Sequence, residues 1–326
     1  MTAVPGSPLR GLLLALLAAA LFGVNGTVSK LALEAGLSSL RLVEIRSVGA
    51  AVLLVAIVAV TRPGTLRVSR RELRFLAVTG VVGIALVQWF YFVAIERLPV
   101  GIALLVEYLA PVMVVLWVRF VRHEPVRRRL WAALALAVVG LAVVAEVWQG
   151  LTLDGVGLMA ALAAAAALAV YYLAGERGLT TRDEMSLAAW IFVAAGLFWS
   201  LLLPWWTFPF DALDDTVALP GPLEGAGTPI WALVAWIVVL GTVAPFVLVL
   251  AALRSLGPAR TGLVGMTEPV LAALVAWVVL AEALSPVQLA GGAVVLAGIV
   301  LAETSRSRPG VFGAHASGTL PEGMAP

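Results

Sequence analysis

Residues 261–300 read TGLVGMTEPVLAALVAWVVLAEALSPVQLAGGAVVLAGIV, two apolar runs that meet at Ser285-Pro286. Each run approaches the roughly 20 apolar residues that a helix needs to cross about 30 Å of hydrocarbon. The first run contains two charged residues, Glu268 and Glu282, and the second contains none. This stretch predicts two adjacent membrane-spanning helices joined by a tight turn.

The composition of the whole chain agrees with this prediction. The 326 residues are 62% hydrophobic and 12% charged, with a mean hydropathy of +1.05. A soluble domain is about 45–50% apolar and about 25% charged. The net charge of +2 argues against a nucleic-acid partner. Because cysteine is absent and His123 and His315 fall in polar segments, we expect no metal site and no cofactor.

The hydropathy pattern predicts an all-α integral membrane protein with ten transmembrane helices. Residues 11–22 would also suit a signal peptide, but their partner segment in the second half favours an uncleaved first helix. The ten predicted segments are 10–29, 40–61, 74–95, 99–120, 129–148, 154–174, 186–206, 229–251, 259–280 and 286–303.

The basic residues predict the orientation. Most of the 21 lie in alternate connections, with clusters at 62–74 and 119–129. The connection at 207–228 holds four acidic residues and no basic one, so we expect it outside the cell. The positive-inside rule then places both termini in the cytoplasm, which an even number of spans permits. The tail at 304–326 is polar and is predicted to be disordered.

The two halves of the chain repeat each other. A shift of 158 residues superposes Gly83 on Gly241, Pro111 on Pro269 and Glu124 on Glu282. A shift of 146 gives a weaker match of the alanine-rich first and sixth segments. Five spans per repeat would invert the second copy, the arrangement of many secondary transporters. The predicted organisation is a cytoplasmic N-terminus at 1–9, a first repeat at 10–148, a second at 154–303 and the tail.

These residues resemble the drug/metabolite transporter superfamily in its ten-helix EamA-type branch. The resemblance covers about 10–303 and is carried by a proline in the fourth helix of each repeat, a loop glutamate, and the Gln-x-x-Gly step at Gln288 and Gly291. The first repeat departs from this last step at Leu130-Trp131-Ala132. The resemblance implies a transporter but no particular substrate. The segment 106–111 is similar to the Glu-x-x-x-Pro segment of exporters of the threonine and homoserine type.

Glu107 and Glu268 are the first candidates for the transport site. Glu107 lies eight residues into its predicted helix, about 12 Å deep. A charged side chain at the bilayer centre costs roughly 2.5–3.5 kcal/mol, so such residues usually face a cavity. A carboxyl group there can bind a cationic substrate or exchange a proton for it. The alternative is a structural hydrogen bond to a neighbouring helix.

Pro111 and Pro269 are candidate hinges. Each removes one backbone donor and frees a carbonyl one turn earlier, at Glu107 and Gly265 respectively. The freed carbonyls could line a cavity and the bend could take part in gating. A fixed bend explains the same residues equally well.

Other polar and aromatic side chains in the spans are further candidates. Arg46 could meet Glu107 or a substrate carboxylate, although snorkelling to the outer interface is somewhat favoured. Trp89 and Trp236 lie mid-span, where a cation could stack on them. For the rest, an interhelical hydrogen bond is as good an explanation as substrate contact. They are Asn25, Gln88, Tyr91, Tyr171 and its neighbour Tyr172.

Three classes of function compete. A secondary transporter of small metabolites or drugs, with export favoured and proton coupling as an option, fits the repeats. It would work in the bacterial inner membrane. The sequence contains no Walker motif, so we do not expect it to hydrolyse ATP itself. An intramembrane enzyme fits poorly, since every Asp lies in a loop or at a helix edge and neither His lies in a span. A receptor or scaffold would not need inverted symmetry. The glycines at 140, 291, 292 and 298 suit close helix packing, and a homodimer through them is an open alternative.

Overall fold

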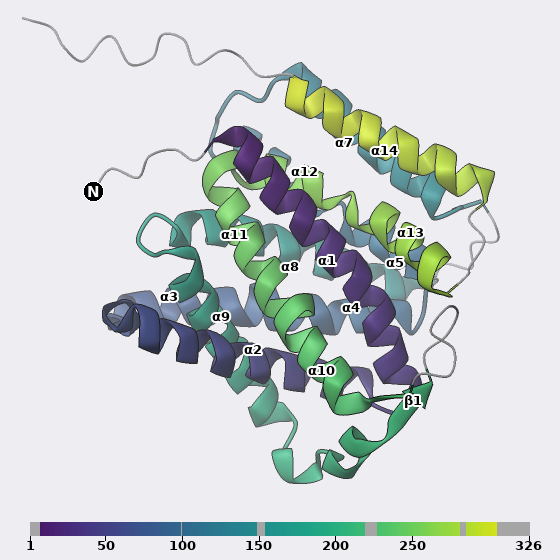
Figure 1. Ribbon diagram of the computed structural model, residues 1–326. Coiled ribbons are helices and arrows are strands. Elements are labelled where there is room, and N and C mark those ends of the chain that lie inside the picture. Colours follow the sequence, from purple (N-terminus) through teal and green to yellow (C-terminus); the bar gives the residue numbers. More distant parts are fainter. Residues whose placement is uncertain (1–6, 99, 149–153, 219–226, 281–284, 305–326) are drawn as a thin grey trace, which may run out of the picture.

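The computed structural model describes residues 7–98, 100–148, 154–218, 227–280 and 285–304. Over these residues the chain is a bundle of helices with one short hairpin (Figure 1). Glu282, His315 and the tail at 305–326 lie outside the described residues.

The elements of the first half begin with two long helices. They are α1 (Pro8–Glu34), α2 (Ser39–Thr61), the 3-10 helix η1 (Pro63–Leu66), α3 (Arg70–Gly80), the π-helix η2 (Val81–Leu86), α4 (Val87–Ile95), α5 (Val100–Glu107), α6 (Ala110–Phe120) and α7 (Arg128–Val144).

The second half follows a similar order. Its elements are α8 (Gly155–Gly178), α9 (Glu184–Leu202), the 3-10 helices η3 (Trp205–Thr207) and η4 (Phe210–Asp214), β1 (Thr216–Ala218), β2 (Gly227–Pro229), α10 (Ile230–Val238), the π-helix η6 (Val239–Val243), α11 (Ala244–Leu256), α12 (Pro258–Gly265), α13 (Glu268–Leu280) and α14 (Pro286–Thr304).

Seven helical stretches of the described chain are long and apolar enough to cross a membrane. They are Pro8–Glu34, Ser39–Thr61, Arg70–Ile95, Ile102–Phe120, Gly155–Gly178, Glu184–Leu202 and Ile230–Leu256. The predicted spans at 129–148, 259–280 and 286–303 do not meet both criteria over their described residues. The structure is therefore that of an all-α, multi-pass membrane protein.

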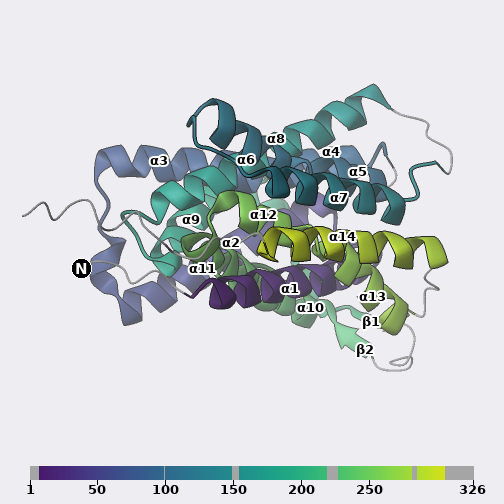
Figure 2. The same cartoon turned by 90° about the horizontal axis from the view of Figure 1, so that it is seen from above.

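The helices of the two halves exchange partners. The first helix, α1, packs on α11 and α13 of the second half, and α8 packs on α4 and α6 of the first half. Two further pairs also join the halves, α2 with α9 and α7 with α14. The pair α7 and α14 lies side by side along one edge of the bundle in two perpendicular views (Figures 1 and 2). The core is thus shared between the halves.

An aromatic cluster marks the centre of the largest apolar core. The ring of Phe246 on α11 meets three other rings edge to face, with centroid distances of 5.2 Å to Phe22, 5.7 Å to Tyr171 and 5.1 Å to Phe192. These rings come from α1, α8 and α9, so one side chain ties four helices together. Edge-to-face pairs contribute about 0.5–1.5 kcal/mol each beyond their buried area.

Each half has a π-helical segment at the equivalent position, which the sequence reasoning did not foresee. In η2, a Cβ added to Gly83 would lie 3.0 Å from Cβ of Tyr171 on α8. In η6, a Cβ added to Gly241 would lie 2.0 Å from Oδ1 of Asn25 on α1. Both glycines therefore let a helix of the other half approach closely. Short π segments are often found at functional sites.

Two helices of the bundle are broken at equivalent positions. The turn at Tyr108-Leu109 separates α5 from α6, and the turn at Met266-Thr267 separates α12 from α13. The residues after each turn include Pro111 and Pro269, within the first two positions of α6 and α13 respectively. Proline suits these positions because the first N–H groups of a helix have no intrahelical partner. In place of a simple kink at each proline, a two-residue turn precedes it and divides the helical stretch.

The glycines of α7 and α14 serve contacts within the chain. A Cβ added to Gly140 would lie 2.8 Å from the Gly291 carbonyl, and one added to Gly298 would lie 2.8 Å from the Ala133 carbonyl. The start of α14 is fixed by a reciprocal cap, because the Gln288 N–H donates to Ser285 Oγ at 3.1 Å and the Ser285 N–H donates to Gln288 Oε1 at 3.0 Å. In the Gln-x-x-Gly step, Gln288 thus caps the start of α14 and Gly291 allows α14 to pack closely on α7.

The long connection after α9 is more ordered than expected. It was predicted as an external loop over 207–228, but it contains η4 and pairs β1 with β2 in an antiparallel hairpin. The register places Val217 opposite Thr228. The prediction missed these strands because three-residue strands give no periodic signal. The hairpin lies at the end of the bundle opposite the α2–α3 connection (Figure 1).

Candidate functional site

The two helix breaks bring Glu107 and Glu268 together. Glu107 is the last residue of α5 and Glu268 is the first residue of α13. Both side chains are half-buried and close enough to interact electrostatically. The helix N-terminus favours the negative charge of Glu268, while Glu107 sits at a C-terminus where no such help exists. The two carboxyl groups therefore occupy one neighbourhood but different electrostatic settings.

Three tyrosines surround this pair of carboxyl groups. Tyr108, in the first break, lies close enough to Glu268 for its hydroxyl to interact with the carboxyl group. Tyr91 on α4 and Tyr172 on α8 both interact electrostatically with Glu107 and Glu268. Phenol groups can donate to a carboxylate or accept from an ammonium group. The site therefore draws residues from four helical stretches.

Arg46 supplies the positive charge of the site. Its Nε donates to Thr242 Oγ1 at 3.1 Å, and its Nη2 donates to the Gly241 carbonyl at 3.3 Å. It is also close enough to Glu268 for electrostatic attraction. These partners at η6 and Glu268 lie inside the bundle, whereas the sequence somewhat favoured snorkelling of Arg46 to the interface.

The π-helix η6 explains why Arg46 finds partners there. Thr242 Oγ1 donates to the Ile237 carbonyl, five residues back, at 2.8 Å. That hydrogen bond orients the hydroxyl so that its lone pairs can accept from Arg46. The neighbouring acid on α2, Glu44, pairs instead with Arg41 at 2.6 Å. Arg46 is thus directed inward and not along its own helix.

Asn25 reaches the same segment from α1. Its side chain is buried, accepts a hydrogen bond from Ser29 Oγ at 3.5 Å, and packs against Gly241. Asn25 and Arg46, two of the predicted site residues, therefore meet at η6. Asn25 corresponds under the 146-residue shift to Tyr171, which packs against Gly83 of η2.

Gln88 and Tyr171 carry buried polar atoms without partners. Within the part of the chain that the structure describes, Gln88 Oε1, Gln88 Nε2 and the Tyr171 hydroxyl have no hydrogen-bond partner. Leaving such a group unpaired costs about 1–3 kcal/mol. A buried amide or hydroxyl in this state calls for a further partner, such as water or a bound solute. Substrate contact by these two residues stays a prediction.

Trp89 and Trp236 lie apart from the charged group. Trp89 is 42% exposed on α4 and stacks on Phe90 at 5.5 Å. It is two residues from Tyr91, so the two side chains leave the helix on different faces. Trp236 packs against an apolar cluster that contains Ile230 and Ile237. Contact of either tryptophan with a substrate stays a prediction.

Sequence reasoning missed two members of this site. Tyr108 and Thr242 were not among the candidates, and Tyr172 was considered only beside Tyr171. Tyr108 had a signal, since it directly follows Glu107 and precedes the proline. Thr242 had none, because its role depends on a π turn. The described residues contain no group of three or more His, Asp or Glu side chains placed to hold a metal ion.

The geometry thus combines two acids, one base and several hydroxyls at the junction of the two halves. Sites formed at interrupted helices between two repeats are typical of membrane transporters. The EamA-like transporter family matches the chain over residues 9–145 and again over 155–304. The chain belongs to this family of transporters, and it is therefore a membrane transporter and not an enzyme.

Individual relatives agree with the family. The threonine/homoserine exporter RhtA of Escherichia coli K12 is 31% identical over 244 residues, which cover 74% of this chain and 75% of the relative. The inner membrane transporter YicL of Salmonella typhimurium LT2, itself described as uncharacterized, is 25% identical over 302 residues, covering 91% and 96%. One solved structure, titled only as the crystal structure of a protein, has a TM-score of 0.73 at 20% identity over 91% of this chain and 98% of that chain. It shares the fold.

Proposed function

We propose that this transporter exports small zwitterionic metabolites, amino acids or compounds like them, across a bacterial inner membrane. The observation that carries the proposal is the position of Glu268, which lies close to both Arg46 and Glu107. An amino acid presents a carboxylate and an ammonium group. Arg46 suits the carboxylate, and a glutamate suits the ammonium group. RhtA, a relative that exports threonine and homoserine by its name, supports the same class of substrate.

The internal symmetry supports alternating access between two inverted five-helix repeats. Both halves carry a π segment and a broken helix at equivalent places, and their first helices exchange partners across the bundle. Inverted repeats give inward-open and outward-open states of similar energy, which a modest binding energy can interconvert. Ten spans, cytoplasmic termini and hinge motion at Pro111 and Pro269 belong to this proposal.

The carboxyl pair supports proton exchange. Two neighbouring carboxylates repel each other, so one proton held between them is favourable. Binding of a substrate ammonium group beside Glu107 would replace that proton. Each cycle would then carry a proton in one direction and the solute in the other.

A counterflow assay tests the proposal. Purified protein in liposomes preloaded with unlabelled solute is offered the labelled solute outside, with L-threonine, L-homoserine, a nucleobase and a cationic dye as separate arms. We expect accumulation of labelled amino acid, and its loss in Glu268→Gln. Glu96→Gln, an exposed acid at the end of α4, is the matched control. Accumulation of the dye alone would replace the zwitterion by a drug as the substrate.

A further inference from the structure

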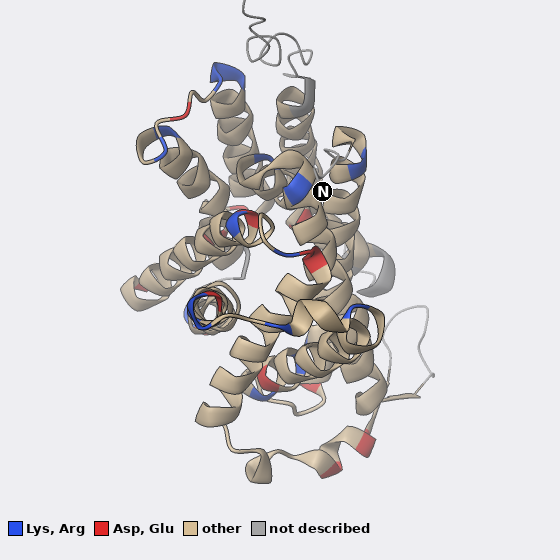
Figure 3. Cartoon of the chain, turned by 90° about the vertical axis from the view of Figure 1, so that its left-hand side faces the viewer, with Lys and Arg blue, Asp and Glu red and all other residues tan. Residues whose placement is uncertain are grey.

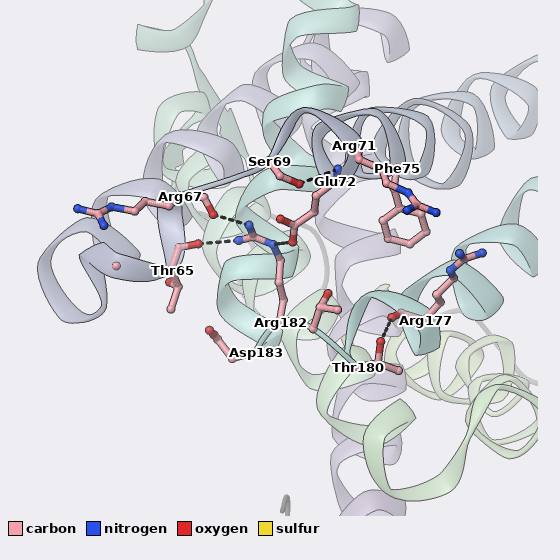
Figure 4. A pocket seen from close by; sticks show the side chains of 12 residues that line it. Thr65, Arg67, Ser69, Arg71, Glu72, Phe75, Arg177, Thr180, Arg182 and Asp183 are labelled. Carbon is pink, nitrogen blue, oxygen red and sulfur yellow. Dashed lines mark hydrogen bonds and ion pairs between the residues drawn. The ribbon is translucent and has the colours of Figure 1, made fainter. Parts of the chain in front are cut away.

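A hollow lies at one end of the bundle, beside the connection between α2 and α3. The cartoon coloured by charge shows several basic residues at this end (Figure 3). The volume of the hollow is about 670 Å³, within the range of small-ligand sites. It lies between the α2–α3 connection, the start of α3 and the α8–α9 connection (Figure 4). We call it the basic pocket, and its charged lining residues are Arg67, Arg71, Glu72, Arg177, Arg182 and Asp183.

Both acids of the basic pocket are already paired. Glu72 forms an ion pair with Arg182, whose side chain is only 6% exposed. The Nη1 of Arg182 also donates to the Thr65 carbonyl at 2.5 Å, and its Nη2 donates to the Arg67 carbonyl at 2.8 Å. Asp183 pairs with Arg62 at 3.1 Å. These contacts form the wall of the pocket and leave no acid to balance the other arginines.

Arg67, Arg71 and Arg177 are the arginines left over, and the last two lie beside the same aromatic ring. Arg71 and Arg177 come from α3 and α8 and flank Phe75, where the Arg177 guanidinium lies 5.8 Å from the ring centroid (Figure 4). Within the described parts of the chain neither forms an ion pair. Both side chains are exposed. Two like charges held near one ring repel each other, and a shared anion would relieve that repulsion.

We propose that the basic pocket binds a phosphate group between Arg71 and Arg177. Guanidinium groups match phosphate oxygens in paired hydrogen bonds, which makes arginine the usual phosphate partner. The phosphate can come from an anionic lipid headgroup at the membrane surface or from a soluble phosphate compound. Basic pockets between helix ends are common sites for such headgroups. Because α3 and α8 lie in the two separate segments that the family matches, the bound phosphate bridges both halves.

The test measures thermal stability by tryptophan fluorescence in detergent micelles. The three arms contain dioleoylphosphatidylglycerol, dioleoylphosphatidylcholine or inorganic phosphate. A ligand that binds only the folded protein raises its Tm. We expect phosphatidylglycerol, inorganic phosphate or both to raise the Tm. In the variant Arg71→Gln/Arg177→Gln, the same rise in Tm should require about tenfold more phosphate or lipid. The control Arg70→Gln/Arg74→Gln removes two exposed charges of the same helix outside the pocket.

Each outcome decides the proposal. A rise with phosphatidylglycerol alone identifies a lipid site, and a rise with inorganic phosphate identifies a soluble anion. An equal response of wild type and the double variant, or an equal loss in the control, overturns the proposal. If the double variant does not fold, native mass spectrometry of Arg71→Gln and Arg177→Gln counts retained phosphatidylglycerol. If both single variants retain as much phosphatidylglycerol as wild type, the proposal is also overturned.

Discussion

The break between α5 and α6 and the break between α12 and α13 occupy the same place in the two halves, yet they carry different chemistry. Both are followed by proline, at Pro111 and Pro269. The first presents Glu107 before the turn, where the second has Gly265. The second presents Glu268 after the turn, where the first has Ala110. The duplicated backbone therefore supplies two similar interruptions, and residues that differ between the copies supply the acids.

This difference explains why one site forms where two halves meet. A symmetric site would place two equal acids in equal surroundings. Here Glu268 has Arg46 and Tyr108 as partners, while Glu107 is left with the like charge of Glu268 and with tyrosines. We therefore propose that Glu268 holds Arg46 before solute binds and that Glu107 takes part in the exchange of proton and substrate.

Arg46→Gln is expected to have the largest effect on transport. It removes the cation from Glu268 and from the two acceptors on η6. Breaking a partly buried charge pair costs about 3–5 kcal/mol, so the initial rate of counterflow should fall at least about a hundredfold. Arg74→Gln, an exposed residue of α3, serves as control. A rate within twofold of wild type would remove Arg46 from the site.

Glu107→Gln sharpens the comparison of the two acids. The amide cannot release a proton, so the dependence of flux on external pH should flatten, with a rate about tenfold below wild type. The protein should still insert and remain folded. The readout is flux measured from pH 5 to pH 9 beside Glu96→Gln. An unchanged pH profile would contradict the assignment of proton exchange to Glu107.

The two π-helical glycines extend the comparison to packing. A Cβ at Gly241 meets Asn25 Oδ1 at 2.0 Å, while one at Gly83 meets Tyr171 Cβ at 3.0 Å. Gly241→Ala should therefore destabilise by about 2 kcal/mol and Gly83→Ala by about 1 kcal/mol. Gly26→Ala on α1 meets nothing within 4 Å and should be neutral or slightly stabilising. Thermal unfolding in detergent measures this order, and a larger loss from Gly83→Ala would reverse it.

The smallest effect is expected from the prolines. Pro111→Ala and Pro269→Ala restore an N–H where the helix start leaves it unpaired, so stability should change by less than about 1 kcal/mol. If the turns act as hinges, transport should slow by roughly threefold in either variant. If both variants transport at the wild-type rate, the two turns are fixed bends and not hinges.

The sequence predicted an all-α membrane protein correctly, and turns beside the two prolines could be expected, because apolar runs and prolines are local patterns. Both can be recognised from residues that are neighbours in the sequence. The contact between Arg46 and Thr242 joins residues 196 positions apart and depends on a π turn, so no local pattern reports it. The same holds for the partners of Asn25. For Trp89, a mid-span position alone does not distinguish a cavity face from an outer face, so its contact with substrate stays a prediction.

Cysteine labelling tests the central claim that solute reaches the carboxyl pair from water. The chain has no cysteine, so Tyr91→Cys and Trp89→Cys each carry a single thiol, two residues apart on α4. A charged, membrane-impermeant thiosulfonate should label position 91 from at least one side, and threonine should slow this reaction, while position 89 stays unlabelled. No labelling at position 91 from either side, or labelling that threonine leaves unchanged, would contradict the account.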